Sequence, residues 1–169
     1  MLEGSHNIVL DTCCIFNLIN GKTLNEVLLL PLNFYVGQIV YSECTTQPCY
    51  ELDDLLKSGK IKLLADVPVE LFAKFNTKYQ LGDGETECLV IGKIHNYVIG
   101  SDDKKARSCI IDELGESSLT GSIGLLKELK MKAIMACDKI FDSFTEMQKS
   151  GGFLPRISQD YFCESSDKK

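Results

Sequence analysis

Short apolar runs alternate along the chain with longer stretches in which apolar positions recur at helical spacing. The apolar runs predict strands at residues 7–10, 34–40, 61–64, 97–100 and 118–120, the second of which leads into a helix. Helical spacing predicts helices at residues 12–20, 23–30, 49–57, 69–79, 85–96, 104–114, 122–133 and 136–149. Because strands and helices alternate, we expect an α/β protein with a central parallel sheet between helices, a three-layer α/β/α fold.

The chain has 169 residues, which suits one domain with its own hydrophobic core. We expect that domain over residues 1–163 and a polar C-terminal tail over residues 164–169. No apolar run approaches the roughly 20 residues that cross a bilayer, and the N-terminus has no basic segment ahead of an apolar one. The sequence therefore predicts a cytoplasmic protein with no membrane segment.

The eight cysteines do not follow a zinc-binding pattern, because no pair of Cys-x-x-Cys motifs is present. Cys88, Cys109 and Cys137 fall among apolar neighbours in predicted helices, where a thiol packs as a small apolar group. We therefore expect reduced thiols, as is usual in the cytosol.

The formal net charge of −6 argues against a protein that binds nucleic acid by neutralising phosphates alone. It leaves room for an enzyme that acts on nucleic acid, because divalent cations held by carboxylates reverse the local sign of the charge.

Two aspartates follow predicted strands. Asp11 comes directly after residues 7–10, and Asp102 comes two residues after the strand at 97–100. Ligands of open parallel sheets bind beyond the carboxyl ends of the strands, so these carboxylates are expected to meet in space. The alternative is that each aspartate only caps the helix behind it.

Two glutamates are further candidates. Glu43 follows apolar residues, although it could also face solvent from an amphipathic helix. Glu85 lies in the first turn of a predicted helix, where a carboxylate also complements the helix dipole. Glu87 lies two residues on and hence on nearly the opposite face, while Asp83 is interpreted as the helix cap.

Four convergent carboxylates repel one another unless cations bind between them. Hard oxygen ligands select Mg²⁺ or Mn²⁺, and such ions activate water and stabilise the charge that develops on a phosphodiester. This chemistry needs no histidine base, so His6 and His95 are not required.

The order and spacing of these acidic motifs resemble those of PIN-domain nucleases. The resemblance covers about residues 7–133 and rests on residues 9–12, 40–43, 84–87, 101–103 with Ala106 and Arg107, and 119–126. It implies a PIN-like fold, an Mg²⁺ or Mn²⁺ site and single-stranded RNA as substrate. Many family members are toxins of toxin–antitoxin pairs, often homodimers that a small antitoxin protein holds inactive. The resemblance assigns the catalytic and metal-binding carboxylates to Asp11, Glu43, Glu85 and Asp102, with Asp103 as an extra metal ligand.

The sequence departs from the family pattern at Cys13, where a small polar residue is common. Asp11 then lacks a usual hydrogen-bonding partner, and we expect Thr12 or Thr120 to orient it.

On the substrate side, Lys104 and Arg107 are expected to bind phosphate, since a guanidinium matches phosphate geometry. Alternatively, these side chains only form a solvated helical face. The same holds for Lys127, Lys130 and Lys132 of the predicted helix at residues 122–133.

Within the PIN resemblance, the spacing to Asp102 favours Glu85 over Glu87 as the metal ligand.

One alternative function is a catalytically inactive PIN-fold module that binds nucleic acid or protein, and the four filled acidic positions argue against it. Another is a phosphatase with an aspartyl nucleophile, which usually requires Asp-x-Asp after the first strand. Here Cys13 takes the place of the second aspartate.

Overall fold

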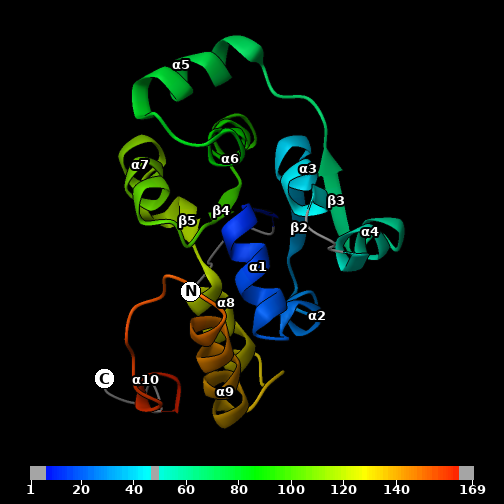
Figure 1. Cartoon of the computed structure of the whole chain (residues 1–169), viewed down its shortest axis with the longest axis vertical. Helices are drawn as coiled ribbons and strands as arrows, with labels where there is room; N and C mark the ends of the chain where they lie inside the picture. Colours follow the sequence, from blue (N-terminus) through cyan, green and yellow to red (C-terminus); the bar gives the residue numbers. More distant parts are fainter. Residues whose placement is uncertain (1–6, 47–49, 164–169) are drawn as a thin grey trace.

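The computed structural model describes residues 7–46 and 50–163. In these residues five strands form one sheet in the order β3-β2-β1-β4-β5, and every neighbouring pair is parallel. The strands are β1 (Asn7–Leu10), β2 (Asn33–Gly37), β3 (Ile61–Leu64), β4 (Val98–Gly100) and β5 (Leu119–Thr120). Figure 1 shows helices on both sides of this sheet, so the predicted three-layer α/β/α fold is confirmed.

The helices follow the strands along the chain. They are α1 (Thr12–Asn20), α2 (Leu24–Val27), α3 (Gln38–Thr46), α4 (Tyr50–Lys57), α5 (Val69–Tyr79), α6 (Asp83–His95), α7 (Lys104–Leu114), the 3₁₀ turn η1 (Glu116–Ser118), α8 (Ser122–Met131), α9 (Cys137–Lys149) and α10 (Asp160–Cys163). The central strand β1 is covered on both faces, which leaves Ile8, Val9 and Leu10 at most 1% exposed.

Several boundaries differ from the sequence prediction. Strand β2 ends at Gly37 rather than at residue 40, because the backbone N–H groups that follow bond to a carboxylate and begin α3. Helix α6 begins at Asp83 after Gly82, so Asp83 is not the cap. Helix α2 is shorter than expected, and neither η1 nor α10 was predicted.

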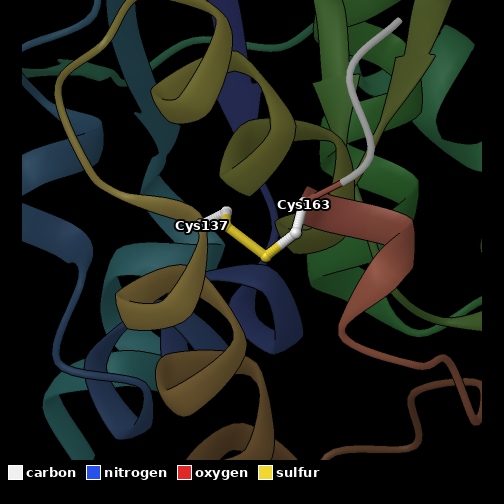
Figure 2. Close-up of a disulfide and its surroundings, with 2 residues drawn as sticks. All are labelled: Cys137 and Cys163. Atoms are coloured by element: carbon white, nitrogen blue, oxygen red, sulfur yellow. A yellow bond between two sulfur atoms is a disulfide. The ribbon is translucent and has the colours of Figure 1, made fainter.

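A disulfide joins the first residue of α9, Cys137, to the last residue of α10, Cys163 (Figure 2). The expectation of reduced thiols is therefore wrong for this pair. The two residues are 26 positions apart and meet only because the chain after α9 turns back. Four other cysteines in the described segments are free, namely Cys13, Cys14, Cys88 and Cys109. Reduced thiols were part of the argument for a cytoplasmic location, and the disulfide removes that part. The cytoplasmic location stays a prediction.

No helix in the described ranges is long and apolar enough to cross a membrane. The predicted tail over residues 164–169 lies outside these ranges. The division into one domain and a tail stays a prediction.

Candidate active site

Asp11 and Asp102 leave the sheet at the same edge. Leu10 of β1 is the register partner of Gly100 of β4, and the backbone N–H of Asp11 donates to the Gly100 carbonyl at 3.0 Å. Asp102 follows two residues after that carbonyl, and its charge contributes to the raised pKa of Asp11. The topology thus brings together the two aspartates that follow neighbouring strands.

Asp11 is 1% exposed and caps α1 by accepting from the Cys14 N–H at 2.8 Å. The Cys13 thiol lies 3.0 and 3.1 Å from its two carboxylate oxygens. Burial raises the pKa of Asp11 from 3.8 to about 6, against the opposing effect of its hydrogen bonds. Asp11 is therefore both the cap that the sequence allowed and a buried carboxylate with an unusual affinity for protons.

Ser101 lies between these aspartates in sequence and is 1% exposed. Its hydroxyl has no hydrogen-bond partner of normal geometry within the described residues, although it is near enough to Asp11 to oppose the rise in that pKa. A buried hydroxyl without a full partner is uncommon in native structures. The Ser101 hydroxyl is thus a buried polar group next to Asp11 that could bind a further partner.

Asp102 is held by groups from two helices. One carboxylate oxygen accepts from the Ser122 N–H at 3.0 Å, and the other accepts from the Asn17 amide at 2.9 Å and from the Ser122 hydroxyl. A Cβ at Gly121 would lie 2.5 Å from the first oxygen, so only glycine permits this approach. Asp102 thus lies at the N-terminus of α8, where the helix dipole stabilises its charge.

Glu43 and Glu85 lie together beside the first turn of α1. The Thr12 hydroxyl donates to Glu43, and the start of α6 packs so closely that a Cβ at Gly84 would lie 2.6 Å from a Glu43 oxygen. Glu85 accepts from the Gly82 N–H at 2.8 Å. Glu43, Glu85 and Thr12 line a pocket of about 250 Å³. Thr12 therefore orients Glu43, whereas the contacts of Asp11 come from Cys13 and Cys14.

Glu87 has a different task. It is 1% exposed and accepts from the backbone N–H groups of Ile39 at 2.9 Å and Val40 at 3.0 Å. Burial raises its pKa, and these hydrogen bonds oppose the rise. A Cβ at Gly37 would lie 2.0 Å from the carboxylate, so glycine at this position admits it. Glu87 caps α3, while Glu85 faces the pocket.

Of the two cationic side chains expected to bind substrate, one lines a pocket and the other has a structural contact. Lys104 lines a second pocket of about 530 Å³ together with Asp102 and Asp103. Arg107 instead donates from one nitrogen to the carbonyls of Ser101 at 2.7 Å and Thr120 at 2.8 Å, which braces the loop that carries Asp102. The structure thus gives Arg107 a positioning contact that was not predicted, and Thr120 takes part through its carbonyl. The phosphate contact of Arg107 stays a prediction.

Asp103 accepts from the Ala106 N–H at 2.7 Å and caps α7. The predicted extra metal ligand therefore has a structural contact of its own. Three contacts of the site were not predicted, namely those of Asn17, Ser101 and Ser122. Ser122 lies within the sequence stretch that resembles a PIN motif, whereas nothing in the local pattern distinguishes Asn17.

The oxygen donors of the candidate site suit a hard divalent cation in their chemistry. Asp11 and Asp102 offer hard oxygens beside an unsatisfied hydroxyl, and burial already disfavours the ionised form of Asp11. Glu43 and Glu85 line the adjacent pocket, which shares Cys13 with the pocket of Asp102. Across the described ranges no three His, Cys, Asp or Glu side chains are close enough to hold a metal ion as they stand. The four carboxylates predicted as metal ligands therefore lie as two pairs, and their role as ligands stays a prediction.

A family model, DUF3368, described as a PIN domain, matches residues 7–163. The chain belongs to the PIN-domain family. This match confirms the family that the acidic motifs suggested. PIN domains are generally nucleases that use divalent metals. The toxin branch stays a prediction.

A solved structure, that of PAE2754 from Pyrobaculum aerophilum, has a similar fold with a TM-score of 0.52 and 10% identity. The match covers 78% of this chain and 94% of that one. At this identity the match shows the PIN-like fold alone. No match was found among curated proteins.

Proposed function

We propose that this PIN domain is a ribonuclease that hydrolyses phosphodiester bonds of single-stranded RNA with the help of Mg²⁺ or Mn²⁺. The observation that carries the proposal is the buried Asp11 beside Asp102 at the carboxyl end of the sheet, with the pKa of Asp11 raised to about 6. A strongly shifted carboxyl with no structural ion pair is typical of a functional site.

In this proposal Asp11 and Asp102 hold the cation, and Glu43 and Glu85 complete its surroundings from the adjacent pocket. A cation bound there would activate water and would offset negative charge on the phosphate. Asn17 and Ser122 keep the Asp102 carboxylate in one orientation. In this role the cation would offset the burial that raises the pKa of Asp11, and the Asp11 carboxylate would be ionised.

The proposal is tested with a labelled unstructured RNA, a structured RNA, and Mn²⁺, Mg²⁺ or EDTA. We expect metal-dependent cleavage of the unstructured RNA, and a fall of about a thousandfold in kcat/KM for Asp11→Asn. The matched control is Asp142→Asn, which neutralises an exposed carboxylate on α9 and should leave cleavage unchanged. Millimolar Mn²⁺ at about ten times its Kd should raise the Tm of the wild type by about 4 °C. It should not raise that of Asp11→Asn.

The inactive binding module is the second candidate. The observation that favours it is that the carboxylates form two pairs rather than one metal-binding group among the described residues. Binding of RNA without cleavage under every metal condition, and without a metal-induced rise in Tm, would support this candidate and contradict the ribonuclease.

The toxin role, the small antitoxin partner and the homodimer are also proposals, supported by the resemblance of the motifs. Induced expression of the wild type should arrest growth of a bacterial host, while expression of Asp11→Asn should not. Size-exclusion chromatography with light scattering gives the number of copies per particle. Growth that continues despite active enzyme would contradict the toxin role and leave the ribonuclease intact.

A further inference from the structure

The segment after α9 forms one side of the larger pocket. That pocket of about 530 Å³ is lined by residues of α1, by Asp102 to Lys104, and by the turn of residues 150–153. No functional role was predicted for this turn. Because the turn and Asp102 line the same pocket, a substrate that contacts Asp102 would lie near the turn.

The turn is fixed against α1. A Cβ at Gly152 would lie 2.5 Å from the Asn17 side-chain oxygen, so glycine permits the contact. The Gly152 N–H donates to the Met147 carbonyl at 3.0 Å, and the N–H of Leu154 donates to the Gly152 carbonyl at 2.8 Å. Because the Asn17 amide also donates to Asp102, a short chain of contacts joins the turn to the candidate active site.

Phe153 stands at the mouth of this pocket and is fully exposed, with a relative accessibility of 100%. The other aromatic side chains of the C-terminal segment have partners. Phe144 and Phe162 are 1% exposed and lie 5.6 Å apart between ring centroids, and the Tyr161 ring lies 3.6 Å from the Lys127 ammonium. Full exposure of a phenylalanine costs hydration free energy, which a stacked partner would recover.

We propose that Phe153 is a stacking platform for an unpaired base of the single-stranded substrate, and that Lys104, which lines the same pocket, contacts the phosphates. The inference rests on the proposed function. Stacking on an aromatic face holds a strand without requiring positive charge. That property suits a protein of net charge −6 whose site is itself acidic. Phe16 of α1 lines the same pocket and gives it a second aromatic surface.

The absence of tryptophan from the chain provides a clean probe. In the Asp11→Asn background, which prevents cleavage, Phe153→Trp places a single indole on the turn. Val69→Trp, at a position 80% exposed at the start of α5, is the matched control. Each is titrated with a ten-residue oligoadenylate and with an abasic oligomer of the same length. We expect saturable quenching of Phe153→Trp by the oligoadenylate, weaker quenching by the abasic oligomer, and no saturable change in Val69→Trp.

Cleavage gives the second readout. Phe153→Ala in the otherwise wild-type protein should lower kcat/KM for unstructured RNA about tenfold, mainly through KM, whereas Phe153→Tyr should retain it. The Tm should not change, because the side chain makes no buried contact.

Each outcome has a distinct meaning. Wild-type cleavage with an unaltered Phe153→Ala and no quenching overturns the platform and leaves the ribonuclease standing. Quenching without any cleavage supports the platform and overturns the ribonuclease. The absence of both overturns the two together. A dimer that becomes a monomer on Phe153→Ala would place Phe153 between copies of the chain, and would also overturn the platform.

Discussion

Asp11 and Glu113 are carboxylates in opposite electrostatic surroundings. Glu113 of α7 lies 2.9 Å from the Lys78 ammonium of α5 and 3.0 Å from the Lys93 ammonium of α6. These contacts lower the pKa of Glu113 from 4.5 to about 2, and the hydrogen bond from Lys78 has the largest effect. Asp11 has no salt bridge within the described residues, and burial raises its pKa to about 6. Glu113 joins three helices through its ion pairs, whereas Asp11 has hydrogen bonds but no cationic side chain beside it in the described residues.

Glu87 lies between these two cases, because it is as buried as Asp11 but accepts from two backbone N–H groups, whereas Asp11 accepts from one. Glu87→Ala leaves the N–H groups of Ile39 and Val40 unsatisfied and should lower the free energy of unfolding by about 3 kcal/mol. Glu85→Ala removes only a partly exposed capping contact and should cost less than about 1 kcal/mol while reducing cleavage. Urea unfolding and the RNA assay measure both variants. Equal destabilisation by the two would erase the distinction between a structural and a functional glutamate.

Asp11→Asn should stabilise the protein in the absence of divalent metal. The pKa of Asp11 is about 6 in the folded protein and 3.8 in a model carboxyl, so the folded state binds more protons between these values. Stability from this group is therefore present below about pH 4 and is lost as the pH rises through about 6. At pH 7.5 we expect Asp11→Asn to gain about 2 kcal/mol. The gain should vanish near pH 3.5.

The measurement is urea unfolding of both proteins with EDTA across that pH range. A wild type more stable than Asp11→Asn at pH 7.5 would mean that the Asp11 charge is already compensated. Such a result would contradict the comparison with Glu113.

Glu113→Gln should have the smallest effect. Its ion pairs are partly solvated, so removing them should lower the Tm by about 2 °C at low salt and by less in 1 M NaCl. The sign is opposite to that of Asp11, because a lowered pKa stabilises the folded state above pH 4.5 and the contribution is lost as the pH falls through about 2. Cleavage should not change, and a loss of cleavage would show that this cluster also serves the active site.

The positions of the sheet-end aspartates could be predicted because they depend on a local pattern and on a general rule for parallel sheets. Asp11 and Asp102 follow apolar runs, and parallel strands place such residues at one edge. The task of Glu87 could not be predicted, since it depends on the N–H groups of α3 almost fifty residues away. Arg107 is similar, because its braced position depends on where β5 ends.

The C-terminal segment was the least predictable region. Cys137 and Cys163 have no spacing signature, and α10 spans only Asp160–Cys163. Their pairing follows from the return of the chain onto α9, where Phe162 packs against Phe144. Tertiary contacts of this kind leave no periodic pattern in the sequence.

The disulfide also determines what happens to a molecule whose chain has been cut. Any peptide bond broken between residues 138 and 162 lies inside the covalent ring that Cys137 and Cys163 close. The two fragments then remain one molecule, and a nicked protein migrates as a single band until reductant is added. The turn that carries Phe153 lies within that ring, so a protease that severs it does not release the last helix.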